Sequence, residues 1–128
     1  CEAYGDVSLL PGNSEAQVKL LIVERLQKLG IQYEIQDLMF VPAVEIDQHD
    51  PVVVSLQRAA KGVLGYLPEA RVSGPGTDGW MTVKRDIPTI MGFGPDGGGE
   101  HGKGEWVDLV SLKKITEVYA RFIVDYLG

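Results

Sequence analysis

Three short segments decide how this sequence is interpreted: GPGTDGW at residues 74–80, IPTIMGFGP at residues 87–95 and HGKGEW at residues 101–106. Glycine, threonine and aspartate favour turns through their backbone chemistry, so the first segment predicts a turn. The second is a continuous apolar run, which is typical of a strand covered on both faces of a sheet. The third places a histidine in a glycine-rich loop. A turn, a buried strand and a histidine loop are therefore expected in that order.

The sequence around these segments predicts helices that alternate with strands. Ser14 and Gln17 form a capping-box pattern, and apolar residues at helical spacing follow as far as the glycine stop at Gly30. Asp50-Pro51 pairs a helix cap with a proline at the first helical position, and Asp108 caps a last, long helix. Helices are predicted at residues 14–29, 51–64, 80–84 and from 108 onward, and strands at 2–10, 32–40, 69–72 and 87–93. This alternation in the second part indicates an α/β fold with a parallel sheet.

Composition narrows the class of partner. The chain has 128 residues and a formal net charge of -6. Without a cluster of Lys and Arg there is no basic face for nucleic acid, and no apolar run approaches the roughly 20 residues of a membrane span. Small molecules or other proteins are the expected partners. A single cysteine, Cys1, excludes an internal disulfide and fits a cytoplasmic protein. The start without Met or a leader predicts a truncated or cleaved chain.

His101 is the strongest candidate for chemistry. It follows the carboxyl end of a predicted parallel strand, where open α/β sheets place their ligands, and the surrounding glycines let the backbone approach a site closely. A single histidine is more often a structural or surface residue than a metal ligand. Glu105 would orient the loop or the imidazole, or would be a solvated acid. His49, between Asp47 and Asp50, is interpreted as part of a solvated linker.

Two further matches are weaker. Residues 74–79 and 92–97 both fit G-x-G-x-x-G, the glycine pattern of dinucleotide-binding folds. That pattern needs a strand before it and a helix whose amino end faces the pyrophosphate. The second match continues into more loop, and the first opens only a short helix. Nucleotide binding is the weaker interpretation.

Taken together, the motifs resemble the end of the zinc-dependent amidohydrolases, the group of acetylornithine deacetylase, succinyl-diaminopimelate desuccinylase, aminoacylase and glutamate carboxypeptidase. That family has a G-T-D turn, an I-P strand that ends in Gly-Pro, and a glycine-rich loop with a metal-ligand histidine and a later glutamate. The matching positions are Gly76, Thr77, Asp78, Ile87, Pro88, Gly94, Pro95, His101 and Glu105. The resemblance covers essentially all of this chain but only the later part of a family member.

The resemblance implies a fold and a division of the chain. Residues 1–41 would be the second half of a ferredoxin-like lid and dimerisation domain, arranged as strand, helix and strand. Residues 42–50 would be a connector, and residues 51–128 the C-terminal α/β segment of a zinc-peptidase-like catalytic domain. The missing N-terminal part of the enzyme and a second copy, joined through the lid, would be its partners.

The resemblance also implies roles for residues. His101 would hold one of two zinc ions, with cobalt or manganese as alternatives. Glu105 would orient His101 without binding the metal itself. Gly76, Thr77 and Asp78 would approach the substrate, an N-acyl amino acid or short peptide. No H-x-D motif and no Glu-Glu pair is present in the chain, so the other ligands and the general base are expected upstream. The isolated chain is therefore expected to be inactive.

One position departs from the family pattern. The first strand commonly reads D-V-R before a Pro-Gly turn, with the arginine gripping the substrate carboxylate, and this chain has Ser8 there. A single hydroxyl does not replace a bidentate charged hydrogen bond. Either the substrate differs, or another arginine such as Arg71 substitutes, or the activity is altered. The rival interpretation is a non-catalytic oligomerisation or ligand-binding module that retains the scaffold.

Overall fold

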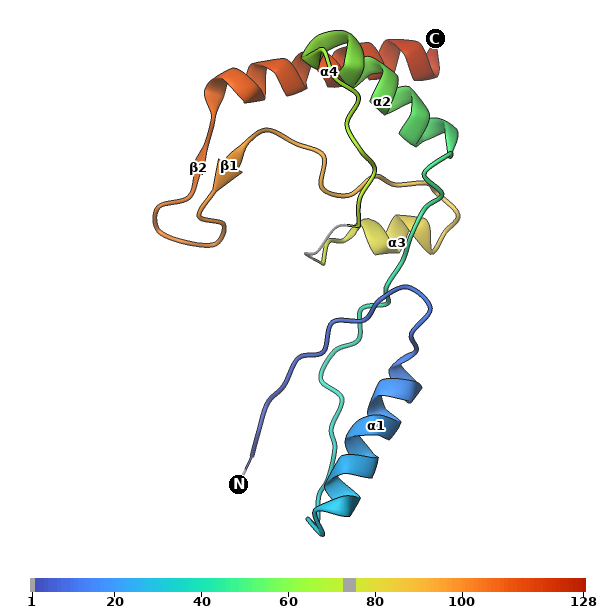
Figure 1. Cartoon of the computed structure of the whole chain (residues 1–128), viewed down its shortest axis with the longest axis vertical. Coiled ribbons are helices and arrows are strands. Elements are labelled where there is room, and N and C mark those ends of the chain that lie inside the picture. Colours follow the sequence, from blue (N-terminus) through green and yellow to red (C-terminus); the bar gives the residue numbers. More distant parts are fainter. Residues whose placement is uncertain (1, 73–75) are drawn as a thin grey trace. The chain divides into compact units, whose positions relative to one another are not determined.

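The computed structural model describes residues 2–72 and 76–128, which form two compact units (Figure 1). Unit 1 is Cys1–Glu45 and unit 2 is Ile46–Gly128. Cys1, expected in a strand, and Gly74 and Pro75 of the first glycine motif lie outside the described residues. The chain is mixed helical with a small two-stranded sheet, which is compatible with the α/β class.

Unit 1 contains one helix, α1, at Glu15–Lys28. The predicted capping box is confirmed: the Gln17 amide donates to the Ser14 hydroxyl at 3.2 Å, and the Ser14 amide donates to the Gln17 side chain at 2.9 Å. Gly30 ends the helix with a positive φ of 67°, as glycine commonly does. Lys19 forms an ion pair with Asp37, and the hydrogen bond to that carboxylate raises the pKa of the lysine.

The apolar stripe predicted on α1 is present but not covered. None of the helix residues is buried. Leu21 and Leu29 are 62% and 70% exposed. Periodicity indicates which helix face is apolar, but burial also requires a second surface, and the described part of unit 1 does not provide one. The stripe of α1 is therefore exposed in the described part of the chain.

Unit 2 is built on two long helices, α2 at Pro51–Leu64 and α4 at Leu109–Leu127, with the short α3 at Gly79–Val83. All three were predicted. The Asp50 carboxylate accepts from the Val52 amide at 2.9 Å, and the Asp108 carboxylate accepts from the Ser111 amide at 2.6 Å, so both expected N-caps are confirmed. Gly65 closes α2 in the left-handed conformation, with φ 82°.

The core lies where α2 packs against α4 (Figure 1). Ala60 of α2 and Val118 of α4 are fully buried, and Leu56 and Ala59 complete the cluster. The helical spacing of apolar residues in α4 predicts a buried stripe of Leu112, Ile115, Tyr119, Phe122 and Tyr126. Ile115 is buried as expected and Phe122 is half-buried, but Leu112, Tyr119 and Tyr126 are exposed, and Val118 was missed. The small side chain of Ala60 lets the helices approach closely, which centres the contact on Val118.

The four predicted strands are absent as paired strands. Residues 2–10, 32–40, 69–72 and 87–93 have no ladder hydrogen bonds, and the sheet of the described residues is instead a two-stranded antiparallel hairpin. Alternation or an apolar run predicts that a segment suits a sheet, but a strand is stabilised by the hydrogen bonds of a neighbouring strand. No described segment provides that neighbour for these four. The expected parallel sheet is therefore not present in the described residues.

Tyr119 ties α4 to the segment before the hairpin. Its hydroxyl donates to the Phe93 carbonyl at 2.5 Å, and its ring meets that of Phe93 edge-on at 5.8 Å. Partial burial raises the pKa of Tyr119 above its ordinary value of 10.0, because burial disfavours the phenolate. The neutral phenol is therefore the form that the fold favours.

This pKa shift predicts how the stability of unit 2 depends on pH. The contribution of neutral Tyr119 is complete below about pH 10 and is lost as pH rises through the raised pKa. We expect Tyr119→Phe to lower the free energy of unfolding at neutral pH by about 0.5–1.5 kcal/mol, the usual net value of one hydrogen bond. We also expect it to flatten the decline above pH 10. Urea unfolding at both pH values measures this, with the exposed Tyr66→Phe as control. Equal alkaline losses in Tyr119→Phe and the parent would contradict it.

Candidate functional site

His101 lies in the loop of a small hairpin formed by β1, Gly97–Gly98, and β2, Trp106–Val107. The strands pair antiparallel, with Gly97 opposite Val107 and Gly98 opposite Trp106. The sequence predicts a glycine-rich loop here but not the pairing of β1 with β2. The available signal was the run of glycines before an aromatic and β-branched pair, because glycine permits the close approach of two backbones.

Two glycines make this hairpin sterically feasible. A Cβ on Gly97 would lie 2.7 Å from the Trp106 carbonyl oxygen. Gly99 has a positive φ of 73°, and a Cβ there would lie 3.0 Å from the Gly104 carbonyl oxygen. Larger residues at these positions would have to displace backbone. The glycines of the loop therefore serve close packing.

The histidine occupies an unusual backbone conformation. The Gly102 amide donates to the Gly99 carbonyl at 2.9 Å, which closes a turn around Glu100 and His101. His101 has a φ of 63°, at the position where such turns usually have glycine or asparagine. A left-handed residue with a full side chain costs about 1–3 kcal/mol and is found most often at functional sites. The conformation leaves His101 exposed at the tip of the loop.

Glu105 stands at the other end of the same loop. Its amide donates to the Gly102 carbonyl at 3.4 Å, so the backbone makes a second turn between His101 and Glu105. Both residues are exposed, and no hydrogen bond joins the Glu105 carboxylate to the His101 imidazole. The structure brings the two residues into one loop but does not pair their side chains.

Hydrogen bonds attach the hairpin to the amino end of α4. The Asp108 amide donates to the Asp96 carbonyl at 2.8 Å, and the Asp96 amide donates to the Ser111 hydroxyl at 2.9 Å. The Ser111 hydroxyl in turn donates to the Asp108 carbonyl at 2.9 Å. Sequence reasoning found the Asp108 cap but missed Asp96 and Ser111, whose roles depend on the pairing of the hairpin. These bonds connect the histidine loop to the helix that forms the core.

The predicted substrate turn lies at the start of α3, separate from the hairpin (Figure 1). Gly76, Thr77 and Asp78 are all exposed. The Thr77 hydroxyl accepts from the Gly79 amide at 3.3 Å, whereas the Asp78 carboxylate makes no cap hydrogen bond. The side chain of Asp78 is thus not used by the helix that follows it.

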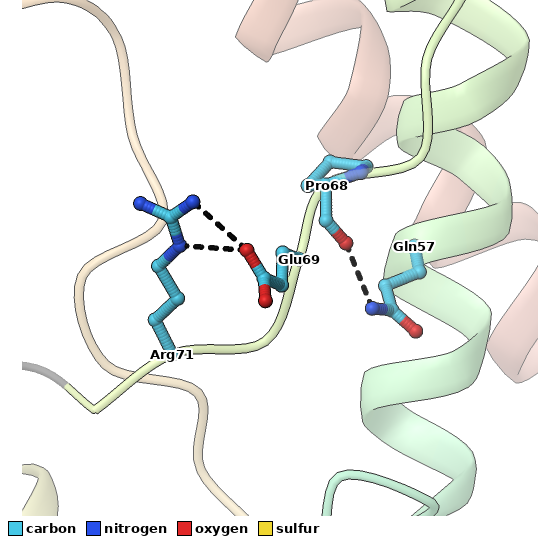
Figure 2. Close-up of polar contacts among 4 residues, drawn as sticks. All are labelled: Gln57, Pro68, Glu69 and Arg71. Atoms are coloured by element: carbon cyan, nitrogen blue, oxygen red, sulfur yellow. Dashed lines mark hydrogen bonds and ion pairs between the residues drawn. The ribbon is translucent and has the colours of Figure 1, made fainter.

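Arg71 was considered as a substitute for the arginine that Ser8 replaces. Figure 2 shows that its guanidinium donates to one oxygen of Glu69, at 3.0 and 2.8 Å. Nearby, the Gln57 side chain donates to the Pro68 carbonyl at 2.8 Å and so ties the segment to α2. Because Arg71 and Glu69 are largely exposed, their ion pair is weak and a stronger anion could replace it.

Neither the other histidine nor the apolar cavity belongs to a chemical site. The His49 amide donates to the Asp47 carboxylate at 2.8 Å, as in an ordinary turn. A cavity of about 220 Å³ lies between α2, residues 88–93 and α4, and its walls are mostly apolar. None of the candidate residues lines it.

Whether this chain can hold a metal ion depends on the ligand side chains that it places together. Within residues 2–72 and 76–128, no group of three or more His, Cys, Asp or Glu side chains is placed to hold a metal ion. A catalytic zinc site normally has three protein ligands. His101, exposed and on a loop fixed to α4, fits as one contributor to such a site.

The same part of the chain, residues 2–72 and 76–128, has no helix long and apolar enough to cross a membrane.

The comparison with known proteins decides the family. The sequence model of peptidase family M20/M25/M40 matches residues 2–125. This chain belongs to that family. No solved structure matches it. Family membership supports the resemblance at the level of the family, and it indicates a hydrolase of the metallopeptidase class. M20 family peptidases are typically metal-dependent.

Proposed function

We propose that this chain is the C-terminal part of a metal-dependent hydrolase that cleaves the amide bond of N-acyl amino acids or short peptides. The observation that carries the proposal is the family match over residues 2–125 in a chain whose histidine loop holds a left-handed His101. The deacetylases, desuccinylases and carboxypeptidases named above are the specific activities that we favour.

The proposed organisation assigns residues 1–41 to half of a lid domain, 42–50 to a connector and 51–128 to the catalytic domain. The boundary between the two compact units, at Glu45 and Ile46, falls inside the proposed connector and supports this division. The partners would be the N-terminal part of the enzyme and a second copy bound through the lid. We place the enzyme in the cytoplasm.

The proposed roles follow the exposed residues of unit 2. His101 is the ligand of one of two metal ions, zinc by preference, with cobalt or manganese able to substitute. When bound, the metal ions activate a water molecule and polarise the amide carbonyl. Glu105 orients the loop, and the turn of Gly76, Thr77 and Asp78 contacts the substrate. The general base is a carboxylate upstream of this chain.

A non-catalytic binding or oligomerisation module is the second candidate. It is favoured by the lack of a three-ligand cluster among the described residues and by Ser8 in place of the carboxylate-binding arginine. The two candidates differ in what the polypeptide upstream of Cys1 contains. An H-x-D motif and a Glu-Glu pair there would favour the enzyme.

The experiment that tests the proposal is hydrolysis by the complete polypeptide that includes this segment. We expect it to release amino acids from N-acetyl amino acids or dipeptides, to stop after chelation and to recover when zinc is added. A complete, folded polypeptide that holds its metal but hydrolyses neither substrate class would contradict the enzyme and favour the module.

Substitution of Ser8 tests the substrate contact. If the missing arginine weakens the grip on a free carboxylate, Ser8→Arg in the complete enzyme should lower KM for N-acyl amino acids. One charged hydrogen bond contributes about 1.5–3 kcal/mol, which corresponds to a decrease of roughly tenfold or more. The matching N-acyl amino acid amides, which lack the charge, should change little. Equal effects on acids and amides would show that position 8 is not at the carboxylate site.

A further inference from the structure

The indole of Trp106 packs over Gly98 in the histidine hairpin. The two residues stand opposite one another in the β1–β2 pairing. A Cβ built on Gly98 would lie 3.1 Å from the indole nitrogen and 3.3 Å from each of two ring carbons. The indole therefore covers the glycine at a distance that leaves almost no room for a methyl group. No conformational reason requires glycine at this position, because its φ is not positive.

This contact closes the base of the loop that holds His101. Beyond it, the chain makes two successive turns, and their backbone hydrogen bonds are exposed to water. Exposed turn hydrogen bonds provide little rigidity, since water competes for the same groups. Below the contact, the strands are already fixed to α4 by the Asp96 and Asp108 backbone bonds. The indole is thus a large side chain between the anchored base of the hairpin and its exposed turns.

We propose that Trp106 is a positioning residue, whose indole, packed over Gly98, holds the His101 loop in a single conformation on α4. The inference rests on the proposed role of His101 as a metal ligand. A metal ligand must stand in one place when the other ligands arrive, and residues that orient a ligand are part of a working metal site. The exposed fraction of Trp106, 58%, leaves its other face open.

Four variants, made in the complete polypeptide that contains this chain, test this proposal. Trp106→Ala removes the indole, and Trp106→Phe keeps an aromatic ring over Gly98. Gly98→Ala adds a methyl group that the indole must move to accommodate, whereas Gly104→Ala adds the same group in the same loop with nothing within 4 Å. The backbone order parameter of His101, from ¹⁵N relaxation, is the measurement, with Ala60 and Val118 as reference amides in the core.

The expected result is a local loss of order. In Trp106→Ala and Gly98→Ala, the His101 order parameter should fall from a rigid value of ~0.85 to below ~0.6, while the reference amides stay unchanged. Trp106→Phe and Gly104→Ala should remain close to the parent. The proposal is overturned if Gly98→Ala and Gly104→Ala behave alike, if the phenylalanine does not restore order, or if the core amides loosen in parallel.

This measurement needs neither metal nor turnover. The positioning role of Trp106 and the metal-ligand role of His101 are therefore tested independently of each other. A rigid His101 in Trp106→Ala would end the positioning proposal and leave the proposed function standing.

Discussion

Replacing His101 by alanine in the complete enzyme is expected to lower kcat/KM by far more than the ~10- to 100-fold typical of residues that only orient a metal ligand. The loss would arise because the imidazole is proposed to be a ligand itself. Glu105→Gln, at a residue proposed to orient the loop, should fall within that smaller range. Steady-state kinetics on the three proteins, with metal content measured on each, gives the comparison.

Two controls separate metal binding from backbone strain. His101 has a φ of 63°, which alanine adopts poorly and asparagine tolerates better. His101→Asn should therefore keep the turn and still lose activity. His49→Ala, in the connector, should leave activity unchanged. Activity of His101→Ala within a few-fold of the parent would remove His101 from the site.

The isolated chain is also expected to self-associate. In unit 1 the helix has no buried residue, and Leu10, Leu38 and Met39 of the flanking segments are 65%, 71% and 85% exposed. Segments that suit a strand but lack a neighbour have unpaired amides and carbonyls, which favour pairing with another chain. In the proposed lid, a strand from the missing half lies between residues 2–10 and 32–40. The chain should fill that gap by strand exchange or by binding the missing half.

Light scattering at low micromolar concentration measures this association. We expect a mean mass well above the 14.0 kDa of one chain, and a decrease when the N-terminal half is supplied. Leu21→Gln, at an exposed position of α1, tests the contribution of the helix face. A sharp monomer with cooperative unfolding would mean that the proposed lid arrangement is wrong.

The helices could be predicted because their signals are local. Ser14 and Gln17 satisfy each other within a single turn, and Asp50, Gly65 and Asp108 act on backbone groups only a few residues away. Nothing elsewhere in the chain has to be known for these bonds to form. The helix ends were accordingly predicted to within one or two residues.

The strands and the α4 stripe could not be predicted in the same way. Residues 87–93 have the composition of a buried strand, yet pairing depends on a neighbour that the described residues do not contain. Val118 is buried in one cluster with Leu56, Ala59 and Ala60 of α2, and the sequence of α4 alone does not contain that information. Long-range partners decide both outcomes.

The candidate site was partly visible in the sequence. His101, Glu105 and the Gly76–Asp78 turn were selected from motifs, and the family match supports the family without testing these residues. The left-handed backbone of His101 and the contacts of Asp96, Ser111 and Trp106 were not visible, because they arise only when the hairpin pairs and docks on α4. Their roles, like that of His101, stay predictions for experiment.

The central claim is that this chain contributes one ligand, His101, to a metal site completed by other residues. Zinc per chain, measured on the purified 128-residue protein after dialysis, tests that claim. A single imidazole does not retain a catalytic zinc, which normally has three protein ligands, so we predict zinc far below one ion per chain and no hydrolysis of N-acetyl amino acids. Stoichiometric zinc, or turnover by the isolated chain, would contradict the account.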